Sequence, residues 1–214
     1  MVLDGDCARA WICSFVAAFR AHSAELDDLD RRTGDGDFAS NLLPAIDRAA
    51  DVSDGLAPAA EFAAFGRLFM AAGGTSGPLF GVWFRELGRA GGEAAAFDLE
   101  ALAAGVRAGV EAVKRLGGAE PGDKTMVDAM EPAATALEGA RDRGESLSAA
   151  LAAAAVAARA GAEATAQLLA RRGRASYVGE AARGVCDPGA VAVALFFEAH
   201  SVLDERAAAE THTR

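Results

Sequence analysis

The run Ala149-Ala-Leu-Ala-Ala-Ala-Ala-Val-Ala-Ala158 is the longest apolar stretch of the sequence, and it indicates the fold class. Alanine has the highest helix propensity, whereas β-branched and aromatic residues favour strands. The rest of the chain shares this bias, with 55 alanines among 214 residues against 11 Phe, 2 Trp and 1 Tyr. We therefore predict an all-α protein whose helices approach one another closely through small side chains.

The length and the composition predict a single soluble domain over residues 1–214. Domains usually contain roughly 100–200 residues, and 52% hydrophobic with 24% charged residues is ordinary for a globular protein. The run 149–158 is about half of the ~20 apolar residues that a membrane span needs. The acidic N-terminus lacks the basic region of a secretory signal. We expect a cytoplasmic protein that does not bind a membrane.

The charge and the cysteines exclude several classes of function. A net charge of −10 repels phosphate backbones, so we expect no nucleic-acid partner. The same charge means that an anionic substrate would need a cation to mediate its binding. Cys7, Cys13 and Cys186 form no CxxC pair and are odd in number, which indicates free thiols in a reducing cytosol.

Hydrophobic periodicity and helix-end signals predict eight helices and no strand. With their expected N-caps, these helices extend from about Asp6 to His22, Phe38 to Asp51, Ala59 to Ala72, Ser76 to Arg89, Asp98 to Gly117, Asp123 to Arg143, Leu147 to Arg172 and Asp187 to Arg206.

The connections between these helices are of two kinds. Residues 27–37, 73–78, 117–125 and 171–189 are dense in Gly, Asp, Ser and Arg, whereas 52–58, 90–97 and 144–146 are plain. The dense connections follow the first, third, fifth and seventh expected helices. Alternate loops of an antiparallel up-and-down bundle share one end. We therefore predict that the four dense loops meet at one end of the bundle and form the functional site there.

The first dense loop contains Asp30, Asp35 and Asp37, separated by Gly34 and Gly36. Two carboxylates ~4 Å apart repel by about 4 kcal/mol at an effective dielectric constant of ~20. A compact loop of this composition therefore needs a cation, and all-oxygen ligands suit Mg²⁺ or Ca²⁺. The spacing does not fit an EF-hand. The alternative is a solvated acidic loop in which Asp and Gly only form turns.

The second and third dense loops each precede a helix. Backbone N–H groups near Thr75 and Ser76 would form an anion site at a helix start, or Ser76 simply caps that helix. In the third loop Lys124 and Thr125 are candidates to face a phosphate, and Met126 is a candidate to contact a flat ring. The alternative for Lys124, and the more common one for a lone lysine, is a solvated charge. Asp123 is the expected cap of the helix that follows.

The fourth dense loop offers Arg174 as a bidentate donor for phosphate oxygens, or as a cap of the preceding helix. Asp187-Pro188-Gly189 is the start of a helix and a candidate wall for a ligand. His22, His200 and His212 lie far apart in the sequence, and no catalytic triad is evident.

Taken together, the four dense loops resemble the L subunit, or L domain, of dihydroxyacetone kinases. The matching stretches are Leu29-Asp-Arg-Arg-Thr-Gly-Asp-Gly-Asp37, Gly73-Gly-Thr-Ser-Gly-Pro-Leu-Phe-Gly81, Ala119-Glu-Pro-Gly-Asp-Lys-Thr-Met126, Gly173-Arg-Ala-Ser-Tyr-Val-Gly-Glu180 and Asp187-Pro-Gly-Ala190. They occur in the family's order, and the resemblance covers nearly the whole chain.

The resemblance implies an eight-helix antiparallel barrel with a nucleotide, ADP or ATP, at one end. It implies that Asp30, Asp35 and Asp37 hold two Mg²⁺ ions against the phosphates and, with Arg174, carry the catalysis. The nucleotide shell that it implies consists of Phe38, Ala39, Ser40, Asn41, Thr75, Ser76, Gly117, Met126, Arg174, Asp187, Pro188 and Gly189, to which our own reading adds Thr125.

The chain departs from the family pattern directly after the aspartates. The family usually has His-Gly, or Thr-Gly in a related branch, where this sequence has Phe38-Ala39. We expect the change to remove one phosphate contact and to restrict the approach of the backbone to the phosphates.

The function that the resemblance implies is phosphoryl transfer from a magnesium-bound nucleotide to dihydroxyacetone, or a related small keto sugar, held on a separate K subunit. Two variants remain open. Either ADP stays bound and a phosphocarrier M subunit of a phosphoenolpyruvate-dependent phosphotransferase system rephosphorylates it in place, or ATP exchanges. The alternative is a non-catalytic nucleotide-binding adaptor or regulator with the same fold.

Overall fold

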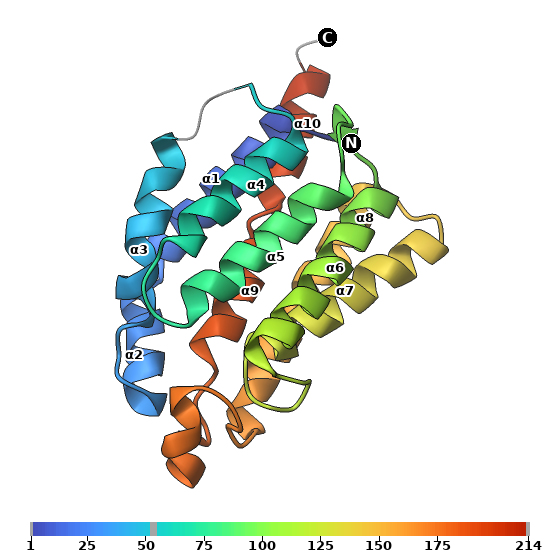
Figure 1. The fold of residues 1–214 in the computed structure, drawn as a ribbon. Helices are drawn as coiled ribbons and strands as arrows, with labels where there is room; N and C mark the ends of the chain where they lie inside the picture. Colours follow the sequence, from blue (N-terminus) through green and yellow to red (C-terminus); the bar gives the residue numbers. More distant parts are fainter. Residues whose placement is uncertain (1, 52–54, 213–214) are drawn as a thin grey trace.

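Helices follow one another along nearly the whole chain in the computed structural model, which describes residues 2–51 and 55–212 (Figure 1). The α-helices are α1 (Gly5–Ala21), α2 (Ser23–Thr33), α3 (Phe38–Asp47), α4 (Pro58–Met70), α5 (Ser76–Ala90), α6 (Leu99–Gly117), α7 (Val127–Asp142), α8 (Leu147–Ala164), α9 (Pro188–Glu198) and α10 (Ser201–His212). Short 3₁₀ helices cover Arg48–Asp51, Thr165–Gln167, Arg174–Tyr177 and Gly179–Ala182. The prediction of an all-α fold is confirmed.

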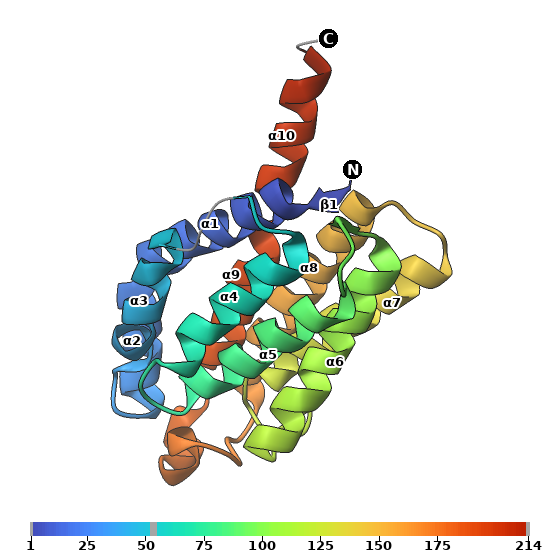
Figure 2. The same cartoon turned by 45° about the horizontal axis from the view of Figure 1, so that its top comes forward.

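The helices from α4 to α9 form an antiparallel bundle in which each helix packs against the next one along the chain (Figures 1 and 2). Helix α1 closes the arrangement by packing against both α4 and α9. Two short strands, β1 (Leu3–Asp4) and β2 (Ala96–Phe97), pair antiparallel with Leu3 opposite Phe97, which corrects the prediction of no strand; two residues are too few to show an alternating pattern. They tie the start of the chain to the connection between α5 and α6.

Helix α9 is buried on all sides, as expected for a helix that is apolar around its whole circumference. Every residue from Ala190 to Phe197 is buried. The Trp11 ring stacks on Phe196 with ring centroids 4.5 Å apart, and Trp11 Nε1 donates a hydrogen bond of 2.7 Å to the Phe196 carbonyl. The core thereby holds α9 in place, and the start of α9 forms part of the site described below.

Small residues allow the helices to approach closely, as the composition predicts. A Cβ atom at Gly88 of α5 would lie 2.6 Å from the carbonyl oxygen of Ala59 in α4. A Cβ atom at Gly161 of α8 would clash with the carbonyl oxygen of Asp128 in α7. A larger residue at either position would separate the two helices.

The principal difference from the predicted elements is α2. Residues 27–33, predicted as part of a loop, lie in this helix, and only Gly34–Asp37 connects α2 to α3. Leu26 and Leu29 are three residues apart on one face of α2, and Arg31 and Arg32 in its last turn favour the helix C-terminus. The many carboxylates of the segment conceal this weak apolar pattern.

The structure corrects several helix ends. The predicted last helix breaks at Ala199–His200, so that α9 is followed by α10, which projects from the bundle (Figure 2). The predicted seventh helix ends at Ala164 rather than at Arg172. Residues 52–54 of the predicted 52–58 connection lie outside the described residues.

The helix caps are confirmed in two cases and corrected in two others. Asp98 accepts from the N–H of Ala101, and Asp187 accepts from the N–H of Ala190, both at 2.8 Å. Ser76 lies inside α5 rather than capping it. Asp123 does not cap α7; instead, its carboxylate accepts from the N–H of Glu120.

One helical segment, Leu147–Gln167, is long and apolar enough to cross a membrane when judged by length and composition alone. It consists of α8 and the 3₁₀ turn that follows. Its inner side chains, among them Leu147, Leu151 and Ala158, are buried, and α8 packs against α7 and α9. This is the environment of a core helix within a bundle.

Candidate functional site

The four dense loops meet at one end of the bundle, as their order along the chain predicts. They enclose a pocket of about 160 Å³. Its wall consists of Asp30, Thr33, Asp37, Phe38 and Asn41; Gly73 to Ser76 and Leu79; Val113, Gly117, Ala119 and Lys124 to Val127; and Arg172 to Ala175 with Asp187 to Gly189.

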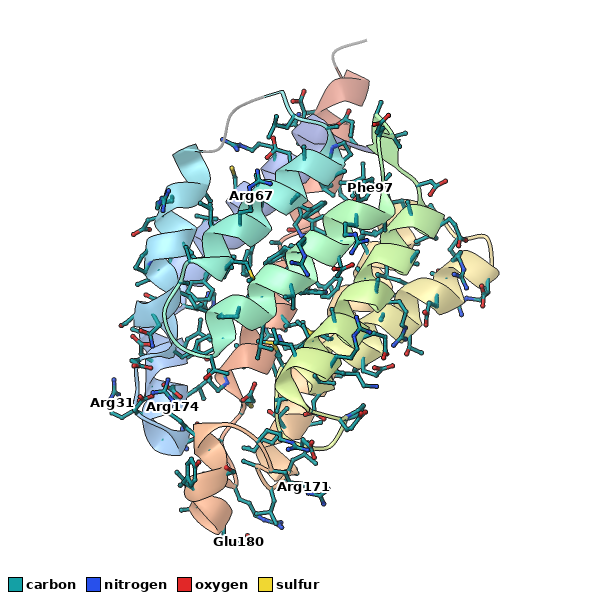
Figure 3. The ribbon with its side chains drawn as sticks, in the orientation of Figure 1. Arg31, Arg67, Phe97, Arg171, Arg174 and Glu180 are labelled. Carbon is teal, nitrogen blue, oxygen red and sulfur yellow. The ribbon has the colours of Figure 1, made fainter. Side chains whose placement is uncertain are left out.

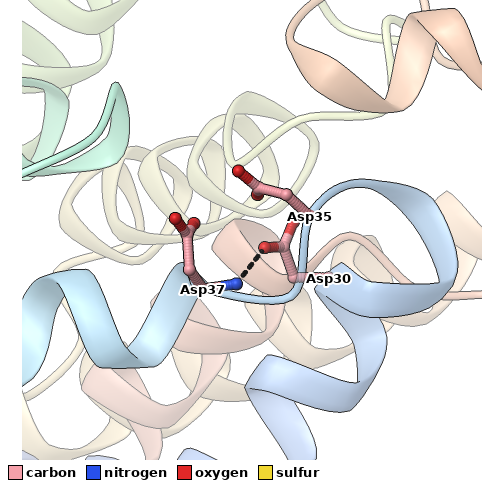
Figure 4. A group of neighbouring side chains, drawn as sticks. All are labelled: Asp30, Asp35 and Asp37. Atoms are coloured by element: carbon pink, nitrogen blue, oxygen red, sulfur yellow. Dashed lines mark hydrogen bonds between the residues drawn. The ribbon is translucent and has the colours of Figure 1, made fainter.

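Three carboxylates gather beside this pocket, as Figure 4 shows. Asp30 lies on α2, Asp35 lies in the connection, and Asp37 immediately precedes α3. One oxygen from each can be chosen so that all lie within 4.8 Å of one another. At this spacing the carboxylates repel one another, and a bound cation would relieve the repulsion.

Asp30 divides its two oxygens between two tasks. Its Oδ2 accepts hydrogen bonds from the N–H groups of Gly36, Asp37 and Phe38, at 2.9, 2.9 and 3.1 Å. Figure 4 shows the bond from Asp37. Its Oδ1 faces Gly34, where a Cβ atom would lie only 2.7 Å away. The backbone therefore fixes one oxygen of Asp30 and leaves the other for a ligand.

The donor set fits Mg²⁺. All three side chains offer hard oxygen atoms, and the described residues add no sulfur or imidazole to this cluster. Mg²⁺ prefers such ligands and commonly shares them with water and phosphate oxygens. The exposed position of Asp35 at the edge of the cluster leaves space for those additional ligands.

Arg174 lies against the same cluster, near the end of α2 (Figure 3). Its guanidinium forms an ion pair with Asp35 and a second one, of 3.3 Å, with Asp37. This position excludes the alternative that Arg174 caps the preceding helix. Because the guanidinium already reaches the carboxylates, it is within reach of any phosphate that a cation holds there.

The Lys124 ammonium is neither solvated nor directed at the pocket, which corrects both alternatives for this residue. Its side chain is 1% exposed, and its Nζ donates to the carbonyl oxygens of Thr165 and Val185, at 2.6 and 2.5 Å. Burial lowers the pKa of Lys124. The neighbouring Thr125 does lie on the pocket wall, and its N–H donates to Asp128 at 2.8 Å.

Part of the pocket wall is apolar. Met126 is 4% exposed and lies close to Gly189. A Cβ atom added at Gly189 would lie 3.3 Å from the Cβ atom of Met126. Leu79 and Val113 complete this part of the wall, although sequence reasoning missed them. Helical spacing could have found both, because each lies about one turn from a predicted residue, Ser76 or Gly117.

The segment after the aspartates is divided between the pocket and other contacts. Phe38 and Asn41 lie on the wall, whereas Ala39 and Ser40 do not. The Ala39 side chain is fully buried in the core, so its methyl group does not restrict the pocket as expected. Phe38 packs near Phe19, with ring centroids 6.5 Å apart, and brings no polar group to the site.

The other predicted residues all lie at the site. Thr75, Ser76, Gly117, Met126, Asp187, Pro188 and Gly189 belong to the pocket wall. Asp35 lies in the carboxylate cluster beside it. Sequence reasoning did not single out Ala119, Val127 or Ala175, whose side chains have no functional group, or Thr33, whose hydroxyl donates to the Leu29 carbonyl at 2.9 Å.

The partly buried carboxyl of Asp187, on the pocket wall, predicts a specific pH dependence of stability. Burial is the main cause that raises the pKa of Asp187 to about 7, and the nearby carboxylates of Asp128 and Asp30 add to the rise. The hydrogen bond from the Ala190 N–H and the charge of Lys124 act in the opposite direction. Because this pKa is higher in the folded than in the unfolded chain, the unfolded chain ionises at lower pH. The free energy of unfolding therefore falls as pH rises from the unfolded pKa toward 7. Between pH 5 and 7 we expect a loss of about 2 to 3 kcal/mol.

The variant Asp187→Asn tests this expectation, because asparagine retains the cap oxygen and cannot ionise. Urea unfolding at pH 5, 6 and 7 should show that the variant loses the downward slope. Asp98→Asn, at the exposed cap of α6, is the control and should keep the wild-type slope. Parallel curves for wild type and Asp187→Asn would contradict the assigned pKa.

Comparisons with known proteins agree with this geometry. The family model described as the DAK2 domain matches residues 32–201. The chain is 33% identical to the ADP-binding subunit DhaL of PEP-dependent dihydroxyacetone kinase 1 from Listeria innocua, over 93% of this chain and 96% of that protein.

Two larger proteins also match. The L-erythrulose 1-kinase of Mycolicibacterium smegmatis is 38% identical over 91% of this chain and 35% of its own length. The crystal structure of the dihydroxyacetone kinase from C. freundii in complex with AMP-PNP and Mg²⁺ has a TM-score of 0.66 and 31% identity, covering 93% of this chain and 34% of that one. This chain thus spans about a third of either protein.

Proposed function

Because this chain belongs to the DAK2 domain family, we propose that it is the nucleotide-binding, phosphoryl-transferring subunit of a kinase for dihydroxyacetone or a related small keto sugar. The observation that carries the proposal is the cluster of Asp30, Asp35 and Asp37 beside a pocket built from four loops. A similar protein is named for ADP binding, and another was solved with AMP-PNP and Mg²⁺.

In this proposal the three aspartates hold two Mg²⁺ ions. When bound, Mg²⁺ neutralises phosphate charge and aligns the phosphates for in-line transfer. Asp30 contributes Oδ1, since its Oδ2 is already engaged by three backbone N–H groups. Arg174 exchanges its carboxylate partners for phosphate oxygens, which a guanidinium binds in bidentate fashion.

The remaining pocket wall orients the nucleotide. The start of α5 presents backbone N–H groups near Thr75 and Ser76, which favour an anion. Met126, Leu79 and Val113 form an apolar surface suited to a flat ring. Asp187, Pro188 and Gly189 close the wall at the start of α9. Transfer then depends on positioning and charge neutralisation rather than on covalent catalysis.

The acceptor sugar belongs, in this proposal, to a separate K subunit. None of the described residues on the pocket wall is a histidine or a cysteine. Several exposed apolar side chains lie at this end and suit a protein partner: Met70, Leu116, Leu169, Tyr177 and Val178. The single domain would act in the cytoplasm, with a phosphocarrier M subunit if ADP stays bound.

A direct assay tests the proposal. The purified chain, a dihydroxyacetone-binding subunit and Mg²⁺ should transfer the labelled γ-phosphate of ATP to dihydroxyacetone, and omission of the chain should abolish the transfer. Mass spectrometry of the purified protein distinguishes the variants. Retained ADP supports the phosphoenolpyruvate-dependent system, whereas rapid exchange supports ATP as the donor. Failure to bind any nucleotide would overturn the proposal.

A second function, a nucleotide-binding adaptor, is favoured by one observation. Phe38 is 7% exposed and offers no polar group where the related kinases usually have His or Thr. An adaptor would bind Mg²⁺–nucleotide but transfer no phosphate in the same assay. The variant Phe38→His would then be the informative comparison, because restored transfer would assign the lost activity to this residue.

A further inference from the structure

We propose that Asp27 is a positioning residue that keeps Asp37 available for a cation. This inference rests on the proposed function, since it concerns the carboxylate cluster of the same site. Asp27 lies one helical turn before Asp30 on α2, so both carboxylates face the start of α3.

The start of α3 has an unusual cap. Asp37 occupies the N-cap position but makes no side-chain cap hydrogen bond. An N-cap aspartate ordinarily accepts from the N–H groups two and three residues later, which here are those of Ala39 and Ser40. Asp27 accepts both instead, at 2.6 and 3.3 Å through Oδ1. Its Oδ2 also accepts from Ser40 Oγ at 2.7 Å.

Asp27 and Asp30 of α2 together accept hydrogen bonds from five consecutive backbone N–H groups. Asp30 binds those of residues 36–38, and Asp27 binds those of residues 39 and 40. N–H groups at a helix start otherwise lack partners. Because Asp27 supplies the missing acceptor, Asp37 is not drawn back onto its own helix and remains beside Asp30 and Asp35.

Removal of the Asp27 carboxylate should draw Asp37 away from the cluster. In Asp27→Ala the N–H groups of Ala39 and Ser40 lose their acceptor, and the Asp37 carboxylate is the nearest replacement. As it turns toward them, it leaves the cluster, and the cation site loses one ligand. In Asp27→Asn the amide oxygen still accepts both N–H groups, so Asp37 should stay in place.

The test measures binding of Mn²⁺ alone to the full chain, by electron paramagnetic resonance of the free ion. Groups that hold metal ligands in place are typically worth roughly 10- to 100-fold in affinity. We expect Asp27→Ala to weaken Mn²⁺ binding about tenfold or more and Asp27→Asn to stay within about threefold of wild type. Asp28→Ala is the matched control, because Asp28 lies on the same helix, is exposed and pairs with Arg31.

Each outcome decides the inference. Unchanged Mn²⁺ affinity in a folded Asp27→Ala, even with a lowered melting temperature, would show a merely structural cap and overturn it. Equal losses in Asp27→Asn and Asp27→Ala would assign the effect to charge and overturn it as well. If Asp27→Ala does not fold, Asp27→Glu, which displaces the carboxylate by one methylene, should show the same loss. A wild-type chain that binds no Mn²⁺ would overturn the proposed function too.

Discussion

We expect Asp37→Ala to remove most of the thermal stabilisation that Mg²⁺–ADP should give to the wild-type protein. A ligand that binds only the folded state stabilises it by about 2.7 kcal/mol at 100 times its dissociation constant. For a chain of this size, that corresponds to a rise in melting temperature of roughly 5–10 °C. The substitution removes one of three clustered carboxylates, so the ligand should raise the melting temperature of the variant only slightly.

Differential scanning calorimetry with and without Mg²⁺–ADP measures this effect. Asp47→Ala is the control, because Asp47 is exposed at the far end of α3 and pairs with Arg20. It should keep the full wild-type shift. Coincident unfolding curves for the wild type with and without Mg²⁺–ADP would show that the site is wrongly assigned, whatever the variants do.

Lys124→Met should loosen the long loop between α8 and α9. The buried ammonium of Lys124 donates to Thr165 at the start of this loop and to Val185 near its end. Methionine fills a similar volume but leaves the Val185 carbonyl without this donor, whereas the Thr165 carbonyl still accepts from the N–H of Leu168 at 3.1 Å. An unsatisfied buried acceptor costs about 1–3 kcal/mol. We therefore expect a loss of about 1–3 kcal/mol in the free energy of unfolding.

Limited trypsin digestion gives a local readout of the same change. The loop contains Arg171, Arg172, Arg174 and Arg183, all potential cleavage sites. In Lys124→Met we expect faster cleavage at these residues under conditions in which the bundle remains folded. Nucleotide affinity should fall as well, because Arg174 is carried on the loosened segment.

Lys114→Met is the matched control, since Lys114 is the other lysine of the sequence. It forms ion pairs with Glu111 and Glu120 at the surface side of α6, and such pairs contribute about 0–1 kcal/mol. The control should therefore resemble the wild type in both assays. If Lys124→Met is as stable and as resistant to trypsin as this control, then Lys124 does not hold the two ends of the loop together.

Much of the fold follows from signals that act within a few residues. Asp98 and Asp187 cap their helices through N–H groups three residues away, and this contact forms wherever the sequence becomes helical. The order of dense and plain loops predicts which end of the bundle holds the site. The exception is α2, where weak apolar spacing among many carboxylates conceals a helix.

The roles of the charged side chains were harder to predict because their partners lie far along the chain. The alternatives for Lys124 were a solvated charge and a phosphate contact, yet its two acceptors are buried carbonyl groups 41 and 61 residues later. Arg174 reaches Asp37 across 137 residues. Asp27 was overlooked because only the turn from α2 into α3 brings it to N–H groups 12 and 13 residues away.

By itself, the sequence determined the helical class, most helix positions and the grouping of the four loops, because helix propensity, caps and connection order are local properties. The tertiary structure alone decided which carboxylates of the site accept from backbone N–H groups and which pair with Arg174. It also decided that the buried lysine serves the loop rather than a ligand. A hydrogen-bonding group takes the partner that packing brings nearest, and for these residues that partner is distant in sequence.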